Sequence, residues 1–510
     1  MRRPWKPEVS GVFCFREFAG TMTDLTTQTA ALPVTLVPQA MPPLRQEVRK
    51  LLLLALPTIG IMLSRLLITS TDFAVVSRLG TAATAAITPC TILVFMVVCL
   101  GMGPSLSIQT YVSQAFGRKE PHETSAFAWQ GFYIAAVFAL LSLPVSRLIG
   151  TLLGLLDIAP EVRDLQVVYL RIAFWCMGFS IVCSSLDGFF NGVQKPWVGL
   201  VAASTSVVFN LVANIVLVFG HLGFPAMGIR GSAVATVIAW GIRAAMLTSV
   251  FLSGRFHMPF RTRANWRFDA ARLRSILSIG WPIALQWVLD IGSWWVFLQL
   301  IMGRFGEKTM AASNISMQLM QVSFMPAIGV GISVCSLVGH AIGERRPELA
   351  LRRGRIGLSI TIVYMGTMAL LYLLIPGPLV GLFSADPDVV RLGCAVLLWG
   401  AIFQVFDAAQ ITYINALRGT GDTLVPAILV ASHCWIVFIA GGLVVARLWP
   451  GWGLNGPWMM CTLYIILLGL ILHRRWTRGG WRKIKLFREA SPREGFPIMQ
   501  VEESTAPPVS

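Results

Sequence analysis

Long apolar stretches, separated by short polar ones, run through almost the whole chain. Each is about 20 residues or longer, which suits a helix that crosses a lipid bilayer. Glycine and proline interrupt several stretches, as at Gly101, Pro144 and Pro326, and membrane helices tolerate such interruptions. The pattern predicts twelve transmembrane helices, near residues 51–76, 83–116, 125–150, 163–192, 196–220, 228–253, 275–302, 309–342, 356–376, 390–417, 424–446 and 453–473.

The two halves of the chain carry the same landmarks in the same order. Each landmark recurs 225 or 226 residues later in the chain. A near-constant spacing over most of the length indicates a duplicated bundle of membrane helices. This is a common build of secondary transporters, which place the substrate path between the two halves. The matched pairs are Pro57 and Pro282, Arg78 and Arg304, Gly117 and Gly343, Pro121 and Pro347, and the Gly-x-x-Gly motifs that begin at Gly228 and Gly453.

Six predicted spans fall in each half, and an even number returns the chain to the side where it began. We therefore expect an all-α membrane protein, with two six-helix bundles related by a pseudo-two-fold axis along the membrane normal. The expected domains are a disordered cytoplasmic arm (1–44), an amino-terminal lobe (45–253), a basic cytoplasmic linker (254–274), a carboxy-terminal lobe (275–473) and a basic cytoplasmic tail (474–510). Met1, Met22 and Met41 are alternative translation starts.

Composition agrees with this interpretation, since 55% of the residues are hydrophobic, 13% are charged and the mean hydropathy is +0.70. The net charge of +17 does not indicate a nucleic-acid partner, because the basic residues gather in segments on one predicted side of the membrane. By the positive-inside rule, both termini lie in the cytoplasm and the protein belongs to the plasma (inner) membrane. Eight of the nine cysteines fall within predicted spans, and Cys14 lies in the arm, so we expect no disulfide.

Several segments resemble the multidrug and toxic compound extrusion (MATE) family, and they are closest to its NorM-like branch. The segments GWPIALQWVLDIGSWWVFLQLIMGRFGEKTMAASNIS and MPAIGVGISVCSLVGHAIG resemble the seventh and eighth helices of that branch. The segment FQVFDAAQITYINALRGTGDT resembles its tenth helix, and STDFAVVSRLGTAATAA and VVFNLVANIVLVFG also fit. The resemblance covers about residues 45–475. It implies a cation-coupled antiporter that expels amphipathic, often cationic, organic compounds.

The resemblance also implies roles by position. Asp72 matches the acidic residue of the first helix, with Asn210 and Asn214 beside it, while Asp290 and Asp407 match acidic residues of the seventh and tenth helices. Two residues depart from the family pattern. Phe403 stands one turn before Asp407, where a Na⁺-coupled relative carries tyrosine, and Arg65 replaces a neutral polar residue. Both departures leave the coupling ion open between H⁺ and Na⁺.

The same acidic residues stand out without the family, because a charge in mid-membrane costs roughly 2.5–3.5 kcal/mol unless it faces a partner or a cavity. Asp407 has Gln404 and Gln410 on its helix face, and Asp290 has Gln286 one turn before it. We predict that these two acids bind the coupling cation, with Asp72 of the first helix as the third cation-coupling residue. A structural hydrogen bond to a neighbouring helix is the alternative for each of them.

Further polar residues are candidates for the lining of the substrate cavity. Asn314, Gln318 and Gln321 share one face of the eighth predicted span, among methionines that suit a site accepting many shapes, although these methionines also suit a plain core. The pair Asn210 and Asn214 fits either a site or helix–helix hydrogen bonding. Arg65 lies two turns before Asp72, and we expect it to face the cavity and tune ion coupling.

Other charged residues in the predicted spans have plainer explanations. We expect Asp187 to be structural and Arg171 and Arg243 to extend from helix ends toward the membrane surface. We expect His340 and His433 to be packing residues.

No sequence motif indicates an enzyme or a cofactor, and without a Walker A motif the energy must come from an ion gradient. The expected partners are small organic substrates and the bilayer, and the expected state is a monomer. A lipid-linked glycan flippase of the same superfamily is the alternative function, although such a flippase is expected to carry several basic residues in its cavity. A membrane scaffold or receptor would not need buried carboxylates. A major-facilitator transporter would carry an Asp-Arg pattern that AFGRKEPHETS lacks.

Overall fold

The computed structural model describes residues 41–155 and 159–487, and all structural statements below concern this part of the chain. By its internal contacts the chain divides into Met1–Pro42 and Pro43–Ser510, and the fold belongs to the second unit. Most of the predicted arm, including Met1, Met22 and Cys14, lies outside the described residues, as does the tail beyond Phe487.

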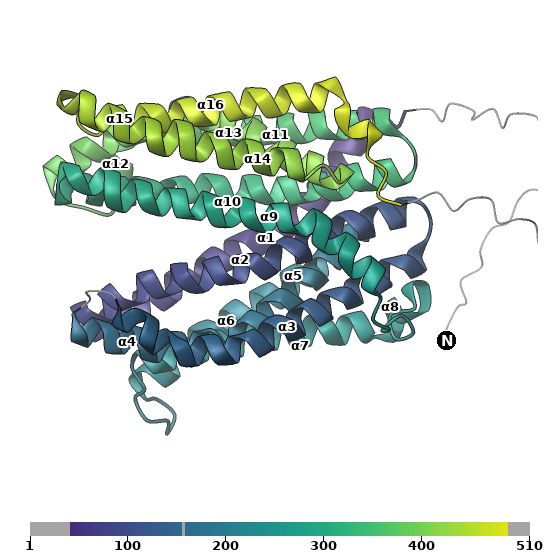
Figure 1. The fold of residues 1–510 in the computed structure, drawn as a ribbon, viewed down its shortest axis with the longest axis horizontal. Coiled ribbons are helices and arrows are strands. Elements are labelled where there is room, and N and C mark those ends of the chain that lie inside the picture. The colour runs from purple at the N-terminus through teal and green to yellow at the C-terminus, as the bar shows by residue number, and fades with distance from the viewer. Residues whose placement is uncertain (1–40, 156–158, 488–510) are drawn as a thin grey trace, which may run out of the picture. The chain divides into compact units, whose positions relative to one another are not determined.

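Every regular element within the described residues is a helix (Figure 1). The first half holds α1 (Leu44–Val76), η1 (Ser77–Leu79), α2 (Thr81–Gly117), α3 (Pro121–Gly154), α4 (Pro160–Ala173), α5 (Cys176–Gly192), α6 (Trp197–Phe219) and α7 (Ile229–Leu252). The linker holds α8 (Gly254–Phe260). The second half holds α9 (Ala270–Val296), η2 (Phe297–Ile301), η3 (Met302–Phe305), α10 (Glu307–Gly343), α11 (Pro347–Leu374), α12 (Pro376–Gly381), α13 (Pro387–Thr420), α14 (Leu424–His433), η4 (Cys434–Ala440), α15 (Gly441–Leu448), η5 (Pro450–Trp452), α16 (Asn455–Arg478) and η6 (Gly480–Lys483).

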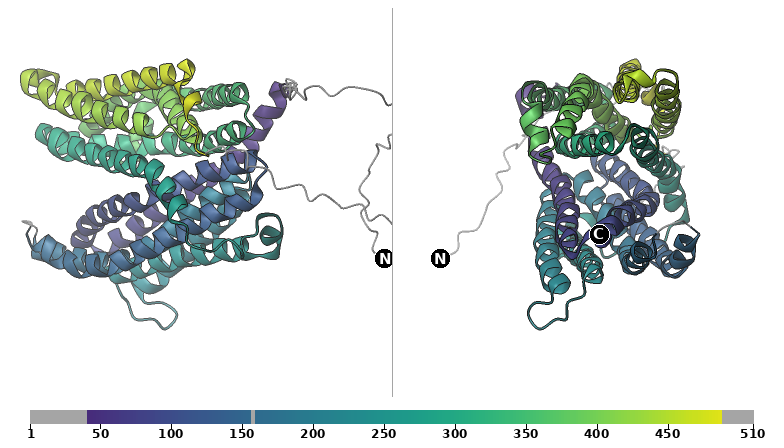
Figure 2. Two further views of the ribbon diagram at one scale, coloured as in Figure 1. Left: turned by 45° about the vertical axis from the view of Figure 1, so that its right-hand side comes forward. Right: turned by 90° about the vertical axis from the view of Figure 1, so that its left-hand side faces the viewer.

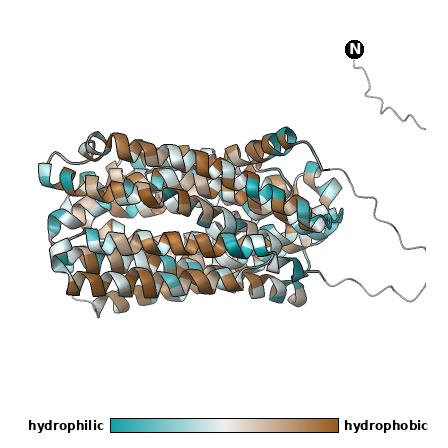
Figure 3. Cartoon of the chain, turned by 90° about the horizontal axis from the view of Figure 1, so that it is seen from above, coloured by the Kyte–Doolittle hydropathy of each residue, from teal (hydrophilic) through white to brown (hydrophobic). Residues whose placement is uncertain are grey.

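Eleven helices are long and apolar enough to cross a membrane, and the bent pair α4 and α5 makes a twelfth if it counts as one span. The sequence predicted one span near residues 163–192. The structure instead breaks it between Ala173 and Cys176 and bends it by 48°. Apolar residues dominate along the helices, as the hydropathy colouring shows (Figure 3). The twelve predicted spans are therefore all present, one of them in two pieces.

The internal repeat extends to backbone conformation. Gly80 precedes α2 with φ 115° and ψ 177°, and Gly306 precedes α10 with φ 96° and ψ 167°. Gly228 and Gly453 adopt nearly the same conformation, with φ 56° and 54° and ψ −135° in both. Only glycine adopts this combination without strain, which explains why the motif recurs at the same offset.

The helices form two lobes, each containing one half of the repeat. In Figure 1 the lobe of α1–α7 lies below the lobe of α9–α16, and the first two long helices of each lobe face the other lobe. The first helix of each lobe also packs into the core of its partner lobe at one end. Leu51 and Leu54 of α1 join the carboxy-lobe core, while Ile276 and Ile279 of α9 join the amino-lobe core. These two pairs are themselves 225 residues apart.

The lobes are bonded together at the end where α1 begins and α2 ends, which we call the closed end. Gln109 of α2 donates to the carbonyl oxygen of Ile332 at 2.7 Å, and Thr110 donates to that of Arg418 at 2.9 Å. Midway along α1, Thr58 donates to the carbonyl oxygen of Gly329 at 2.7 Å. A side chain at Gly329 would place its Cβ 2.7 Å from the backbone of Ile59, so only glycine permits this approach.

Beyond Thr58, no interlobe hydrogen bond of α1 occurs among the described residues. The two lobes diverge toward this opposite end, which we call the open end, as the left view of Figure 2 shows. The part of α1 after Thr58 therefore makes no hydrogen bond to the carboxy lobe among the described residues.

The chain after α16 returns from the carboxy lobe to the amino lobe. Phe487 lies edge-on to Tyr111 and Phe127, with ring centroids 6.0 Å and 5.9 Å apart. The guanidinium carbon of Arg118 lies 4.5 Å from the centre of the Phe487 ring. This segment adds a further connection between the lobes at the closed end.

Candidate functional site

Two acidic side chains lie close together inside the carboxy lobe. Asp407 of α13 is 7% exposed, and Asp290 of α9 is partly buried. The two carboxylates are near enough to interact electrostatically. Within the described residues, no hydrogen bond ends on the carboxylate oxygens of either residue. Two like charges in such surroundings repel each other, and no donor among the described residues offsets this repulsion, so the pair has a tendency to take up a cation.

Residues that sequence reasoning missed surround this acid pair. Tyr464 and Cys461 of α16 and Cys434 of η4 all lie in the neighbourhood of Asp290. The Tyr464 hydroxyl is buried and has no hydrogen-bond partner in the described part of the chain. The sequence offered one indication of Tyr464: it places a polar hydroxyl in the middle of an apolar span, and the chain has only seven tyrosines.

Two short π-helical turns, η2 and η4, lie beside the acid pair. The first directly follows α9, seven residues after Asp290, and the second begins at Cys434. Phe297 and Phe438 from these turns pack together, with ring centroids 4.7 Å apart. Such turns are rare and often occur at functional sites. Sequence reasoning missed both turns.

The predicted companions of the acid pair occupy different surroundings. Gln404 is fully buried, and its Oε1 accepts a hydrogen bond from Ser323 at 3.3 Å. Its amide nitrogen, Nε2, has no partner among the described residues. Phe403 is fully buried in the apolar core of the carboxy lobe. Gln286 of α9 is partly buried. Gln404 therefore shares the polar interior with Asp407, whereas Phe403 belongs to the packing.

The polar residues predicted for the eighth span lie on α10. Gln318 is exposed, and Asn314 and Gln321 are partly buried. They lie on the open-end side of the lobe contact at Gly329. This placement leaves them available to a ligand between the lobes.

Asp72 lies inside the amino lobe and is 3% exposed. Its Oδ1 accepts hydrogen bonds from Asn214 at 2.7 Å and Asn210 at 3.2 Å. Its Oδ2 accepts one from Thr236 of α7 at 2.7 Å. The structure thus brings the three predicted residues together and adds Thr236, which sequence reasoning missed. Unlike the carboxy-lobe acids, Asp72 is fully supplied with donors.

Three charged residues form a second cluster in the amino lobe. Arg243 of α7 donates to Asp187 of α5 at 2.7 Å, and Arg65 of α1 lies 4.0 Å from the same carboxylate oxygen. The prediction that Arg243 extends toward the membrane surface was wrong, because its side chain is only 2% exposed. A buried carboxylate one helix away holds it inside the lobe, and a single sequence does not reveal that contact. Arg171, by contrast, is exposed on α4.

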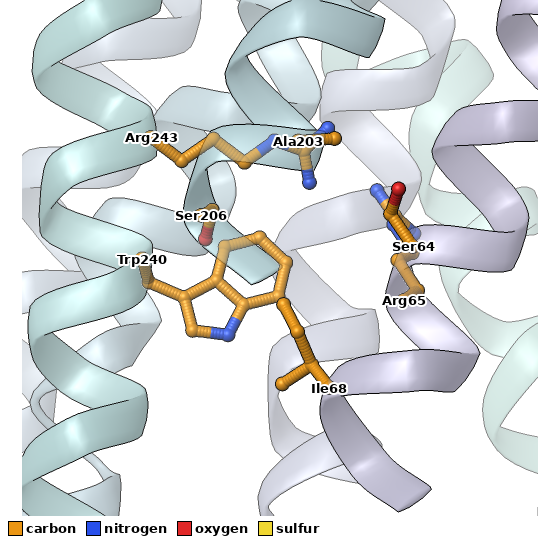
Figure 4. A pocket seen from close by; sticks show the side chains of 7 residues that line it. All are labelled: Ser64, Arg65, Ile68, Ala203, Ser206, Trp240 and Arg243. Atoms are coloured by element: carbon orange, nitrogen blue, oxygen red, sulfur yellow. The ribbon is translucent and has the colours of Figure 1, made fainter. Parts of the chain in front are cut away.

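A small, narrow pocket lies beside this cluster, between α1, α6 and α7 (Figure 4). Its lining residues are Ser64, Arg65, Ile68, Ala203, Ser206, Trp240 and Arg243. In the close view, Arg243 reaches from α7 toward α1, with the Trp240 ring beneath it. Arg65 was expected to face a cavity, and it does line this pocket.

The two histidines occupy local positions. His433 Nδ1 lies 2.8 Å from the carbonyl oxygen of Leu429, one turn earlier on its own helix. His340 Nδ1 lies 3.5 Å from Glu344 near the closed end. Neither residue reaches the acid pair or the arginine cluster.

Comparisons with known proteins agree on one family. A family model described as MatE matches residues 57–216 and 282–442. The chain is 30% identical over 451 residues to the "Probable multidrug resistance protein NorM" of Mesorhizobium japonicum, covering 85% of this chain and 94% of that protein. It is 29% identical to the protein of the same name from Deinococcus radiodurans, covering 85% and 96%. The fold matches "Crystal structure of MATE in complex with MaL6" with a TM-score of 0.79, at 16% identity, covering 86% and 98%.

Proposed function

Because the chain belongs to the MatE family, whose relatives include multidrug resistance proteins, we propose that it is a multidrug efflux transporter that couples export to a cation gradient. Its substrates are amphipathic, often cationic, organic compounds, and its coupling ion is H⁺ or Na⁺. It works as a monomer in the plasma membrane, with both termini in the cytoplasm and no cofactor. This is a transport role and not an enzymatic one.

One observation carries the coupling part of the proposal: Asp290 and Asp407 lie together without hydrogen-bond donors among the described residues. A bound cation neutralises the pair and makes it less costly to bury. Its release restores the repulsion. The occupancy of the pair thus changes the stability of the carboxy lobe, which is what ion coupling requires.

The arrangement of the lobes supports alternating access. With the termini in the cytoplasm, as the basic segments predict, the closed end faces the cytoplasm and the open end faces outward. A cation that enters from outside binds the acid pair and displaces the substrate toward the exterior. The lobes then separate at the closed end and admit a new substrate.

The surroundings of the acid pair favour H⁺ over Na⁺ as the coupling ion. Na⁺ needs several oxygen ligands at once, and a proton needs only one carboxylate. Phe403 supplies no oxygen beside Asp407, and its ring is buried in the core. Tyr464 offers one hydroxyl near both acids. We therefore propose that protons couple transport at least as well as Na⁺.

The alternative, a lipid-linked glycan flippase, calls for several basic residues in the central cavity. The pocket of Figure 4 holds two, Arg65 and Arg243, and Asp187 offsets one of their charges. That single excess charge fits a headgroup bearing several phosphates poorly, so drug export remains the proposal.

Export from proteoliposomes by variants of the two acids tests this function. Asp290→Asn and Asp407→Asn should each abolish cation-driven export of a cationic dye while leaving insertion and folding intact. Asp388→Asn is the matched control, because Asp388 is an exposed acid at the open end, where Lys308 binds it at 2.8 Å. Wild-type export by both acid variants would disprove the coupling role.

A further inference from the structure

The linker between the lobes presents arginines that no acid neutralises. It follows α7 at the closed end of the amino lobe, where α3 begins (Figure 1). The acids beside it are already engaged, because Arg272 pairs with both Glu123 and Asp269 at 2.9 Å. Five other linker arginines are exposed and form no ion pair within the described residues, namely Arg255, Arg261, Arg263, Arg267 and Arg274. The linker therefore carries a strong uncompensated positive charge.

Two large aromatic side chains are exposed among these arginines. Trp266 is 57% exposed and Phe268 is 56% exposed. Side chains of α3 hold this part of the linker in place. Trp129 Nε1 donates to the carbonyl oxygen of Thr262 at 2.6 Å, and the Tyr133 hydroxyl donates to that of Trp266. The fold itself thus presents the two aromatic rings at the surface.

The aromatic rings continue an exposed apolar stripe of α3. Phe268 packs edge-on against Tyr133, with ring centroids 5.3 Å apart. Val137 and Leu140 follow Tyr133 at helical spacing, and both are exposed. Apolar side chains that a membrane-spanning helix exposes along one face contact lipid tails. Phe268 therefore lies where the lipid-facing surface of α3 ends.

The start of α9 shows the same order of side chains. Arg274 is exposed, and the exposed residues Leu277, Trp281 and Leu285 follow it on one face of the helix. The linker thus joins two lipid-facing stripes, one on α3 and one on α9. An arginine stands at the linker end of the α9 stripe, where the bilayer gives way to its headgroups.

From this arrangement we infer that the linker binds anionic phospholipids of the surrounding bilayer. Trp266 and Phe268 enter the interface beside the lipid tails, where aromatic side chains are favoured. Arg267 and Arg274 bind the phosphates of the headgroups, because a guanidinium matches phosphate oxygens with paired N–H donors. The positive-inside rule accounts for the arginines but not for the exposed rings between them. The inference goes beyond the proposed function and does not depend on it.

Quenching of tryptophan fluorescence by brominated lipids tests the inference on the full-length protein. Nanodiscs contain phosphatidylcholine and phosphatidylglycerol, with only one of the two lipids brominated at a time. The difference between the wild type and Trp266→Phe isolates the signal of Trp266. The association constant of phosphatidylglycerol at this site should exceed that of phosphatidylcholine at least about fivefold, as one basic residue near an anionic surface provides.

Arginine variants separate the linker from the overall charge of the protein. Arg267→Gln with Arg274→Gln should bring the lipid preference at Trp266 to within about twofold of unity. Arg171→Gln is the matched control, because Arg171 of α4 is exposed and lies beside Gly150, near the far end of α3. It should leave the preference unchanged, whereas raised salt should lower the preference in the wild type.

Three results would overturn the inference. If neither brominated lipid quenched Trp266, the linker would not enter the interface. Equal quenching by the two lipids in the wild type would exclude a site for anionic headgroups. A preference that survives in the double arginine variant, or that falls equally in Arg171→Gln, would show that these linker arginines do not hold the lipid.

Discussion

Arg353 and Glu47, 306 residues apart, form a buried ion pair that joins the two lobes at the closed end. The Arg353 Nε donates to Glu47 Oε2 at 2.7 Å, and both side chains are at most 6% exposed. Arg353 also donates to the carbonyl oxygen of Leu337 at 2.8 Å. The pair fixes the start of α1 against the carboxy lobe at the closed end.

Removing one partner of this ion pair should open the closed end. A buried pair that loses one member is destabilised by about 3–5 kcal/mol. Hydrogen–deuterium exchange of residues 107–117 and 332–343 should therefore quicken in Glu47→Gln. Arg482→Gln is the control, because it breaks the exposed Arg482–Glu348 pair, which contributes at most about 1 kcal/mol. Unchanged exchange in Glu47→Gln would show that the pair does not hold the lobes together.

Phe487 should also stabilise the closed end. Phe487→Ala removes two edge-on aromatic contacts and a cation–π contact, each worth roughly 0.5–1.5 kcal/mol. Exchange in residues 110–127 should rise and the melting temperature should fall. Phe383→Ala, which truncates an exposed ring of the carboxy lobe, is the comparison. Equal melting temperatures for the two variants would contradict this role.

Asp72 should contribute to folding more than the carboxy-lobe acids do. Asp72→Asn gives up charge-assisted hydrogen bonds from Asn214 and Thr236, each worth about 1.5–3 kcal/mol. A thermal unfolding assay in detergent should show a larger loss of stability for Asp72→Asn than for Asp407→Asn, whose carboxylate has no such donors. The reverse order would contradict the contrast drawn between the two lobes.

Arg65 should discourage cationic substrates. Arg65→Gln removes an excess positive charge from the amino lobe, so export of a cationic dye should improve relative to that of a neutral compound by a few-fold. The ratio of the two export rates in one batch of proteoliposomes measures this effect. An unchanged ratio would mean that Arg65 acts only through its packing.

Sequence predicted the features that depend on one helix at a time. The repeat and the spans follow from spacing along the chain, and the structure contains both. The repeat extends to Leu51 and Ile276, which are 225 residues apart and which each pack into the core of the opposite lobe.

Contacts between helices were beyond such reasoning. Thr236 reaches Asp72 from 164 residues away, and Arg243 of α7 pairs with Asp187 of α5 from 56 residues away. A lone threonine or arginine in a span has no local signal that names its partner. The break at residues 174–175 was also missed. Neither residue is a proline or a glycine, so the local sequence does not mark the break.

Efflux driven by each gradient separately tests the central claim most directly. Proteoliposomes loaded with a cationic dye receive a pH gradient alone or a Na⁺ gradient alone, for the wild type and for Asp290→Asn with Asp407→Asn. The account predicts that the pH gradient drives wild-type efflux at least as fast as the Na⁺ gradient does, and that the double variant responds to neither. Efflux that requires Na⁺ and ignores the pH gradient, or that persists in the double variant, would contradict it.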